Sequence, residues 1–388
     1  MRTAVAGLLV GAMAVTGLAL VPGLAGPAAA EVVVGDTPEP SWRVNGRVFA
    51  VEIAGDTVFV GGDFDTATSP GGDTEPRLNL AAFDVGTGEV LDWRADTDAT
   101  VRALDARKGF LYVGGSFGQV GGKPRSRLAK VNLGTAAVNG TFAPRLNGEV
   151  RAVEAHARAV YAGGSFTRVG RRDRRHVVKL GAASGKVDRG FVASTNLPVW
   201  ALVRNPASPT LYVAGRFSAV NGARRSGVAA VHSGSGRTRS VVFRNSARET
   251  LGLAVNDAGS RLFTAGGTRE NAAAAWRTTT GARVWRRRAR GDVQAIEFHR
   301  GSVYFGFHDG FAEKTSAKVL AARARTGVLD EDFCPSFDKF QGVLAIDVTD
   351  DEVVVGGRFT DVSGVPAEGF ARFLPPARAA GPAPCDTP

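Results

Sequence analysis

A short stretch of this chain matches the pattern that surrounds the nucleophilic serine of many hydrolases. Residues 114–118 read Gly-Gly-Ser-Phe-Gly, which fits G-x-S-x-G. That serine normally occupies a sharp turn between a strand and a helix. Ser116 instead ends an apolar, strand-like run, and other copies of the same run carry Asp or Arg at this place. The sequence therefore assigns Ser116 no catalytic role, and we name no catalytic residue.

The five histidines do not form a pattern typical of a metal centre. Metal sites need clustered ligands, and the sequence contains no HxxxH motif and no carboxylate–histidine cluster. We therefore predict neither a metal nor a cofactor. His308 precedes Asp309 in the most divergent copy of a repeat described below, and this polar pair is the best candidate for acid–base chemistry. We retain His308 as a candidate binding residue.

The first thirty residues have the three parts of a secretory signal. Arg2 supplies positive charge, residues 8–21 are apolar, and residues 28–30 are the three alanines of a cleavage site. We predict a signal peptide over residues 1–30 and a secreted, extracellular protein that starts near Glu31. No other long apolar run follows, so the sequence predicts no membrane span.

The chain has two cysteines, Cys334 and Cys385. An even pair in an exported protein usually forms a disulfide. Cys385 lies in a Pro/Ala-rich tail over residues 375–388, so a Cys334–Cys385 bond would hold this tail against the folded body. A reactive thiol is the alternative, but neither a CxxC motif nor a neighbouring histidine supports it.

A repeat that runs through most of the chain must position these residues. Each copy has a V-x-A-[VLI] segment or a degenerate form of it, followed by an apolar run that ends in Gly-Gly or another pair beginning with Gly or Ala. The small-residue steps begin at positions 61, 114, 163, 214, 265, 306 and 356, which are 41 to 53 residues apart. A period of about 50 residues with several short strands is typical of a propeller blade. The sequence predicts an all-β fold, a seven-bladed β-propeller.

One complete copy, residues 101–143, predicts four antiparallel strands at 101–106, 110–115, 127–133 and 138–142. We expect the glycine pair to let the neighbouring blade approach, and the phenylalanine after it to pack between blades. The last copy lacks a fourth strand, and a matching segment, Ser41-Trp42-Arg43, lies near the other end. We expect this segment to complete the last blade and close the ring over residues 41–374, after a linker at 31–40.

These repeats resemble those of the delta-60-type repeat family, a large and mostly uncharacterised group of secreted bacterial β-propellers. The resemblance rests on residues 111–117, Leu-Tyr-Val-Gly-Gly-Ser-Phe, with Arg-Leu-Ala at 127–129, and on their counterparts over about residues 41–374. It implies a propeller fold. It implies no activity, because the family has none in common.

Basic residues gather in the connections between the second and third strands of blades two to four. Segments 118–127, 167–175 and 218–226 hold ten basic residues and one acid, Asp173, in a chain of net charge +11. We expect these connections to share the top face with the channel mouth, which would be acidic beside blades seven and one. An ordinary solvated surface is the simpler alternative. The ten basic residues are Lys123, Arg125, Arg127, Arg168, Arg171, Arg172, Arg174, Arg175, Arg224 and Arg225.

Two positions vary between copies although their neighbours stay the same. The residue inside V-x-A is Arg102 in the second copy and Arg151 in the third. The residue before the recurrent phenylalanine is Arg216 in the fourth copy, and His308 takes that place in the sixth. We expect both positions near the channel and add these residues to the candidate binding set. Adaptation of each residue to its own neighbouring blade is the alternative.

These features favour a secreted, non-enzymatic binding or scaffold module whose Arg-rich face meets an anionic partner, such as a surface polymer, a glycan or an acidic protein. An extracellular enzyme, glycan-cleaving or quinone-dependent, is an alternative that requires a polar cluster around Arg102, Arg151, Gln294 and His308 at the channel mouth. A purely structural surface protein is the third. The sequence shows no nucleic-acid-binding module and does not predict the oligomeric state.

Overall fold

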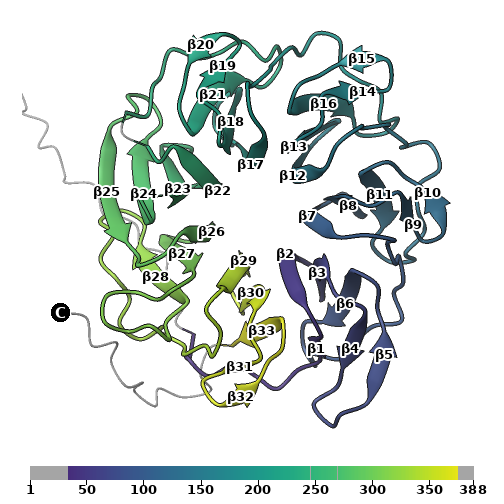
Figure 1. The fold of residues 1–388 in the computed structure, drawn as a ribbon, viewed down its shortest axis with the longest axis vertical. Helices are drawn as coiled ribbons and strands as arrows, with labels where there is room; N and C mark the ends of the chain where they lie inside the picture. Colours follow the sequence, from purple (N-terminus) through teal and green to yellow (C-terminus); the bar gives the residue numbers. More distant parts are fainter. Residues whose placement is uncertain (1–33, 245, 269, 375–388) are drawn as a thin grey trace, which may run out of the picture. The chain divides into compact units, whose positions relative to one another are not determined.

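The structure is a computed structural model that describes residues 34–244, 246–268 and 270–374. These residues form strands, turns and loops but no helix. Seven antiparallel sheets follow one another along this part of the chain, and we number them sheet 1 to sheet 7 (Figure 1). The all-β prediction is therefore confirmed.

Each of these sheets has a central second strand that is hydrogen-bonded to a first and a third strand. The first strands are β2 (Arg47–Ala54), β7 (Val101–Arg107), β12 (Val150–His156), β17 (Val199–Arg204), β22 (Glu249–Val255), β26 (Val293–His299) and β29 (Gly342–Val348). The second strands are β3 (Thr57–Asp63), β8 (Phe110–Gly115), β13 (Ala159–Gly164), β18 (Thr210–Gly215), β23 (Arg261–Gly267), β27 (Ser302–Phe307) and β30 (Val353–Arg358). The third strands are β6 (Leu80–Asp84), β11 (Leu128–Asn132), β16 (Val177–Gly181), β21 (Val228–His232), β24 (Ala272–Arg277), β28 (Val319–Arg323) and β33 (Phe370–Phe373).

Short hairpins join the second and third strands of five sheets. They are β4–β5 (Thr66–Thr68, Thr74–Pro76), β9–β10 (Gln119–Val120, Lys123–Pro124), β14–β15 (Arg168–Val169, Arg172–Asp173), β19–β20 (Ala219–Val220, Ala223–Arg224) and β31–β32 (Asp361–Val362, Val365–Pro366). The N-terminal strand β1 (Arg43–Val44) pairs with β4.

Small residues set the approach of one sheet to the next. The first strands contact one another in chain order, and β29 of sheet 7 contacts β2 of sheet 1 (Figure 1). A Cβ on Gly61 would lie 2.5 Å from Val101 Cγ1 of sheet 2, and a Cβ on Gly356 would lie 2.3 Å from Val48 Cγ1. Sheet 7 therefore packs on sheet 1 through the same contact that joins sheet 1 to sheet 2. The expected role of the glycine pair is confirmed.

The phenylalanines after the glycine pairs form part of the packing between sheets, as the repeat predicted. Their side chains are all buried: Phe64, Phe117, Phe166, Phe217 and Phe359. Phe117 belongs to a hydrophobic cluster that also contains Phe59 of sheet 1 and Leu111 of sheet 2.

Every first strand has a β-bulge at the residue inside V-x-A or its counterpart. In sheet 2 the pairing shifts between Val101 and Ala103, so Arg102 has no residue opposite it. A bulged residue turns its side chain out of the regular ladder. The bulged residues are Phe49, Arg102, Arg151, Trp200, Leu251, Gln294 and Leu344.

Four strands per sheet, as the sequence predicted, occur in the described residues only in sheet 5, where β25 (Arg283–Arg288) pairs with β24. In sheet 2 the corresponding segment makes a single bridge, Val131 to Val138. Asn139 Oδ1 then accepts hydrogen bonds from the N–H groups of Thr141 (3.1 Å) and Phe142 (3.0 Å). A side chain that binds its own backbone in this way competes with the ladder and ends the strand.

The N-terminal segment links the last sheet to the first. The Glu39 N–H group donates to the Arg372 carbonyl in β33 (2.9 Å), and Trp42 Nε1 donates to a carboxylate oxygen of Glu89 in sheet 1 (2.5 Å). We expected this segment to complete the last blade. The bond to β33 is made by Glu39, just before residues 41–43, whereas β1 pairs with the hairpin of sheet 1 and also donates from the Val44 N–H group to the Glu368 carbonyl of sheet 7 (3.0 Å).

Some predictions concern residues outside the described ranges. These are the signal peptide at 1–30, the tail at 375–388, and Cys385 as partner of the buried Cys334. Residues 34–40 of the predicted linker are described, and they lie against sheet 7 through Val34 and the Glu39 hydrogen bond. None of the described residues forms a helix long and apolar enough to cross a membrane.

A buried ion pair stabilises the junction of sheets 7 and 1. Arg372 Nε lies 3.4 Å from Glu352 Oε2, and the two side chains are 3% and 0% exposed. The Arg372 guanidinium also donates to the Val85 carbonyl in sheet 1. Lys130 makes the equivalent bond from sheet 2 to the Ala182 carbonyl of sheet 3 (3.0 Å).

We predict that Arg372→Ala destabilises the fold by about 3 kcal/mol, because it leaves the Glu352 carboxylate buried without a cation. Burial raises the pKa of Glu352 and Arg372 counteracts this rise, so the loss should be larger at pH 8 than at pH 5. Urea denaturation at the two pH values measures it. The double variant Arg372→Ala/Glu352→Ala should recover part of the loss, and a double variant no more stable than Arg372→Ala at either pH would contradict the pairing.

Candidate functional site

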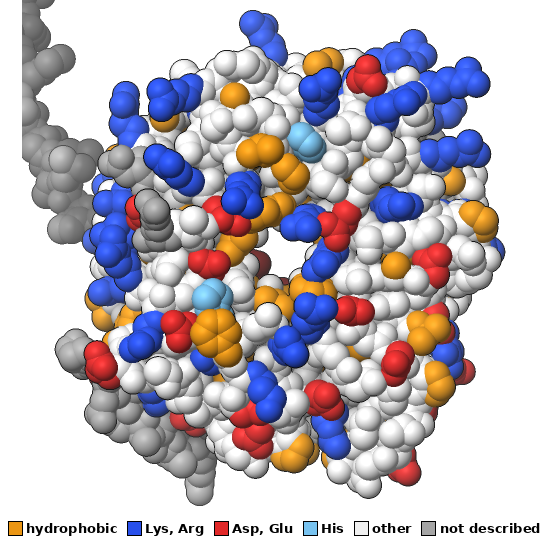
Figure 2. All heavy atoms as spheres, viewed as in Figure 1, with side chains coloured by type: hydrophobic (Ala, Val, Ile, Leu, Met, Phe, Trp, Pro, Cys, Tyr) orange, Lys and Arg blue, Asp and Glu red, His pale blue; other side chains and the backbone are white. Residues whose placement is uncertain are grey.

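The hairpins place most of the predicted basic residues at the outer edge of the fold. In Figure 1, β10, β15 and β20 lie on the far side of their sheets from the first strands. The sequence analysis expected them at the channel mouth. They lie outside because a bridge between Thr97 and Val120 ties the hairpin of sheet 2 to the segment leaving sheet 1. Figure 2 shows Lys and Arg side chains along this edge, whereas acidic and basic side chains lie side by side around the central hollow.

Arg125, a predicted binding residue, has a structural role. Its side chain is buried, Nη1 donates to the Pro124 carbonyl, and Nη2 donates to the Asn139 carbonyl, both at 2.6 Å. Those carbonyls belong to the hairpin and to the segment after the third strand, so the guanidinium joins two loops of one sheet. Arg125 is therefore not available to a ligand.

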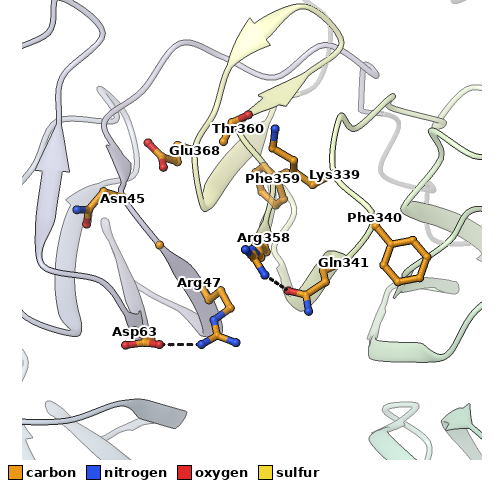
Figure 3. Close-up of a pocket in the computed structure, with 11 residues that line it drawn as sticks. Asn45, Arg47, Asp63, Lys339, Phe340, Gln341, Arg358, Phe359, Thr360 and Glu368 are labelled. Atoms are coloured by element: carbon orange, nitrogen blue, oxygen red, sulfur yellow. Dashed lines mark hydrogen bonds and ion pairs between the residues drawn. The ribbon is translucent and has the colours of Figure 1, made fainter.

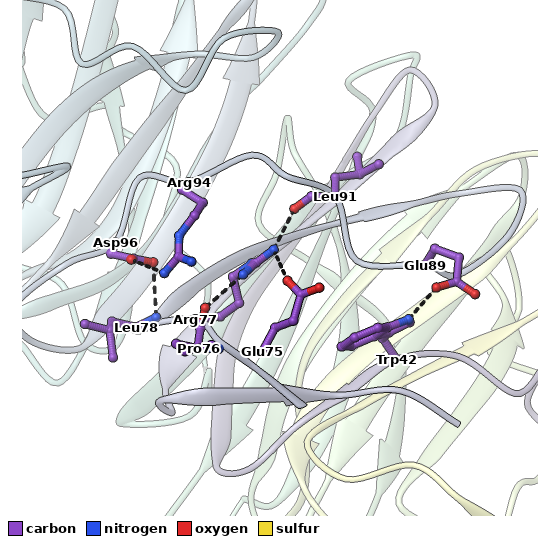
Figure 4. Close-up of polar contacts among 9 residues, drawn as sticks. All are labelled: Trp42, Glu75, Pro76, Arg77, Leu78, Glu89, Leu91, Arg94 and Asp96. Carbon is purple, nitrogen blue, oxygen red and sulfur yellow. Dashed lines mark hydrogen bonds and ion pairs between the residues drawn. The ribbon is translucent and has the colours of Figure 1, made fainter. Parts of the chain in front are cut away.

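The same arginine recurs in the neighbouring sheets. Arg174 donates to the Asp173 carbonyl (2.8 Å) and Arg225 to the Arg224 carbonyl (2.8 Å), and both are only partly exposed. Figure 4 shows the counterpart in sheet 1, Arg77, whose guanidinium donates to two backbone carbonyls and pairs with Glu75 at 2.7 Å. Arg225 uses its second arm to donate to the Arg239 carbonyl (2.9 Å), so its guanidinium joins two loops as that of Arg125 does. Within the described residues, Arg174 makes the hairpin bond alone.

Six of the predicted hairpin cations are exposed: Lys123, Arg168, Arg171, Arg172, Arg175 and Arg224. Arg168 has an acidic neighbour, since its Nε lies 3.9 Å from Asp173 Oδ1. The others therefore present the larger share of the free charge. Arg127 is only partly exposed and has a positive φ of 71°, at the turn into the third strand.

Four cations gather around one cavity on sheet 3. Arg171 and Arg172 line a cavity of about 420 Å³ together with Lys186 and Arg189 from the segment after β16. The other lining residues are Val169 and Val187, and no acid is among them. None of the four cations forms an ion pair within the part of the chain that the structure describes. We call these four residues the basic cluster.

The sequence analysis missed half of this cluster. It counted charges only in the connections between second and third strands, and Lys186 and Arg189 follow the third strand instead. The signal that could have revealed them is the short segment 184–189, where the third copy has two cations beside the turn.

Arg102 and Arg151 come together around one carboxylate. Glu149 Oε1 lies 2.9 Å from Arg102 Nε, and Glu149 Oε2 lies 2.5 Å from Arg151 Nε. The Arg102 guanidinium also lies 3.9 Å from the ring centroid of Phe49, and that of Arg151 lies 5.7 Å from the ring of Trp200. The single carboxylate of Glu149 thus neutralises one of the two guanidinium charges, and the aromatic rings add weaker cation–π contacts. The two arginines are therefore held in place by Glu149, and Arg151 stays exposed.

His308 contacts a different set of residues. Its Nε2 accepts a hydrogen bond from the Asp292 N–H group (3.0 Å), and its Nδ1 is buried with no hydrogen-bond partner. An accepting Nε2 places the proton of the neutral ring on Nδ1, where no substrate can reach it. The ring lies 5.0 Å from that of Phe340. His308 therefore positions an aromatic side chain, and Arg216, exposed at the end of β18, is not among its contacts.

A group of five partly buried carboxylates was not predicted from the sequence. Each directly follows the V-x-A-[VLI] segment of a first strand, and the five are Glu52, Asp105, Glu154, Glu297 and Asp347. Glu297 of sheet 6 interacts electrostatically with Asp347 of sheet 7 and with Glu154 of sheet 3. Sheets 3 and 6 are not neighbours, so these carboxylates face a shared space between the first strands.

Several of these carboxylates bind the next sheet. Asp347 Oδ2 accepts from the Ile53 N–H group of sheet 1 at 2.6 Å. Glu52 Oε1 accepts from Ala106 N–H of sheet 2 at 2.8 Å, and Asp105 Oδ2 accepts from Ala155 N–H of sheet 3 at 2.7 Å. The carboxylates thus act as hydrogen-bonded links between successive first strands, with the link from sheet 7 to sheet 1 among them.

Confinement raises the pKa values of the whole group. Burial, reinforced by repulsion from Asp347, raises the pKa of Glu297 to about 8. Burial raises the pKa of Glu154 to about 7 and that of Asp347 to about 6, although backbone N–H groups oppose both shifts. Burial and neighbouring carboxylates also raise the pKa values of Glu52 and Asp105 well above their usual range.

Few cations counter this charge. Arg107 and Arg204 act on Glu154, and His299 acts on Asp347. Within the described ranges, no group of three or more His, Cys, Asp or Glu residues could hold a metal ion. The geometry therefore gives the carboxylates a role in cohesion of the fold.

We predict that stability falls as pH rises from about 5 to 8. An acid with a raised pKa in the folded state keeps its proton after the unfolded chain has lost it, so the folded state is increasingly disfavoured above the unfolded pKa of about 4. Carboxyl groups with a lowered pKa, such as Asp338 with a pKa of about 2, change the stability with pH only in a more acidic range. Their contribution is lost as pH falls below about 4.

The variant Glu297→Gln isolates one titrating group. The free energy of unfolding of this variant should increase by about 2 kcal/mol relative to that of the parent protein when the pH is raised from 5 to 8. The reason is that Gln does not ionise, whereas Glu297 of the parent must keep its proton in the folded state. Chemical denaturation at both pH values measures this gain. Glu331→Gln is the control at an exposed position, and its difference in unfolding free energy from the parent should be the same at pH 5 and at pH 8. If the difference for Glu297→Gln were also the same at both pH values, the raised pKa would be contradicted.

Neither a family model nor a curated protein sequence matches this chain. A solved structure with a similar fold is the crystal structure of the computationally designed protein Ika8. The two share 14% sequence identity at a TM-score of 0.53, over 88% of this chain and 99% of the designed chain. At this identity the similarity concerns the fold alone.

Proposed function

We propose that this chain is a secreted seven-bladed β-propeller that binds an anionic extracellular polymer through the basic cluster. Support for the propeller comes from the repeated contact between a small residue and the next first strand, which also joins sheet 7 to sheet 1. Arg372 makes the same kind of bond from sheet 7 to sheet 1 as Lys130 makes from sheet 2 to sheet 3. A delta-60-type membership and a Cys334–Cys385 bond remain parts of the same proposal.

The observation that carries the binding proposal is the basic cluster itself. Four cations around one cavity, with no acid among the lining residues, repel one another in the free protein. A polyanion removes this repulsion and supplies several charges at once. Exposed Arg175 and Lys123 lie on the same series of hairpins and can extend the contact along a chain. Because these groups are exposed, salt should weaken the interaction strongly.

The enzyme and purely structural alternatives gain no comparable support. The residues that the enzyme alternative named do not form one set of contacts, since Arg102 and Arg151 share Glu149 whereas His308 contacts Asp292 and Phe340. A structural protein would not need four uncompensated cations in one place.

The test compares dextran sulfate with uncharged dextran, which have the same backbone and differ in charge. The purified protein should bind dextran sulfate at low salt, lose most of this binding at high salt, and not bind dextran. Arg171→Glu/Arg172→Glu should lower the affinity at low salt by more than about tenfold, since two attractive charges become repulsive. Fluorescence anisotropy of a labelled polymer measures both effects.

The control Arg277→Glu/Arg288→Glu makes the same change of net charge at exposed arginines of sheet 5. It should weaken binding much less than the cluster variant. Equal weakening by both variants would show a nonspecific charge effect and contradict the assigned surface. An acidic protein bound in preference to dextran sulfate would contradict the polymer as the partner.

A further inference from the structure

Sheet 7 departs from the other sheets in the segment before its first strand. In five sheets, an Asn or Asp in this segment fastens the hairpin, as Asn147 does by accepting from the N–H groups of Thr167 (2.9 Å) and Arg168 (2.8 Å). The five fastening residues are Asn45, Asp98, Asn147, Asn196 and Asp338. Because these residues occupy equivalent places, the number of residues between each of them and the following first strand can be compared from sheet to sheet.

The comparison shows an insertion of two residues. In sheet 1, the valine that begins the V-x-A segment, Val48, follows the fastening residue Asn45 after two intervening residues. The spacing between fastening residue and valine is the same from Asp98, Asn147 and Asn196. From Asp338 the equivalent valine is Val343, two positions later. The extra length lies between Asp338 and Val343 and includes Lys339 and Phe340. In repeat folds, insertions of this kind often mark the binding face.

The insertion exposes an aromatic ring and holds it in place. Phe340 is 61% exposed, more than any other large hydrophobic residue among those described. Its ring lies 5.0 Å from that of His308, and its carbonyl accepts a hydrogen bond from the Asp309 N–H group (3.1 Å). A large apolar side chain that is both exposed and fixed indicates a contact surface.

Phe340 forms part of the wall of a cavity of about 740 Å³. Sites for small molecules typically measure about 300–1,000 Å³. The wall combines the inserted segment with residues of sheets 7 and 1, including Gln341, Arg358 and Glu368. Figure 3 shows Phe340 and Glu368 at opposite sides, with Arg358 between them.

The charges of this wall leave one guanidinium uncompensated. Arg47 is paired with Asp63 at 3.0 Å, and Lys339 is paired with Asp338 at 3.0 Å. Arg358 donates only to Gln341 Oε1, at 3.2 Å, and no acid pairs with it within the described residues. It therefore has donors free for an anionic group of a ligand.

We propose that this cavity binds a sugar ring that carries a carboxylate. The Phe340 ring offers an apolar surface to one face of the sugar, and Arg358 binds the carboxylate. The side-chain amide of Gln341 can donate to a hydroxyl group at the ring edge, and the Glu368 carboxylate can accept from one. A flat heteroaromatic ligand would fit less well, because Phe340 is the one exposed aromatic side chain among the residues that line the cavity.

The experiment measures binding of methyl glucuronide and of methyl glucoside, which differ in the carboxylate. Saturation-transfer NMR and isothermal titration should show saturable binding of the glucuronide and at least about tenfold weaker binding of the glucoside. Phe340→Ala should lower affinity for both sugars. Arg358→Gln should remove the preference for the acid while retaining the weak binding of the neutral sugar.

Two controls separate this site from the basic cluster. Val192→Ala removes an exposed apolar side chain elsewhere and should leave sugar binding unchanged. Arg171→Glu/Arg172→Glu should also leave it unchanged, whereas Phe340→Ala should not alter binding of dextran sulfate. Absence of saturable binding, or binding that neither pocket variant changes, would overturn the proposal. Equal affinity for the two sugars would overturn the role of Arg358.

Discussion

The contact between a small residue at the end of one second strand and the first strand of the next sheet is the constraint on which this structure depends. A methyl group on Gly61 or Gly356 would lie within 2.5 Å of the neighbouring valine, so larger residues would force the sheets apart. Close packing at this point brings successive first strands into contact and brings the Glu149 carboxylate to both Arg102 and Arg151.

The same packing creates an electrostatic cost at the centre. Burial among the first strands raises the pKa values of Glu297, Asp347 and Glu154, and repulsion from the other two carboxylates adds to the rise at Glu297. Hydrogen bonds from the next sheet offset part of the cost, as Ile53 does for Asp347. The same carboxylates therefore destabilise the fold through their burial and stabilise it through their hydrogen bonds to the next sheet. Exposed positive charge gathers at the outer edge, where the hairpins of sheets 2 to 4 project into solvent, and the Arg358 guanidinium has no acidic partner among the described residues.

The repeat in the sequence was sufficient to predict the strands, the role of the glycine pairs and the buried phenylalanines, because each depends on local spacing. It could not show that Arg125 is buried, since a structural arginine and an exposed one have the same surroundings in the sequence. The early end of the fourth strand depends on side-chain hydrogen bonds such as those of Asn139. The carboxylates were visible as a recurrent acid after V-x-A-[VLI], but their grouping requires the arrangement of the sheets. The insertion at Phe340 is recognised by counting from the fastening residues, and these are identified by hydrogen bonds that only the structure shows.

The central claim is that the basic cluster on sheet 3 is the anion-binding surface. The most direct measurement is a crystal structure of the protein with a sulfated disaccharide, in which anomalous scattering from sulfur locates the ligand. The account predicts sulfur positions within hydrogen-bonding reach of Arg171, Arg172, Lys186 and Arg189. Sulfur bound only at other surfaces, with this cavity empty, would contradict it.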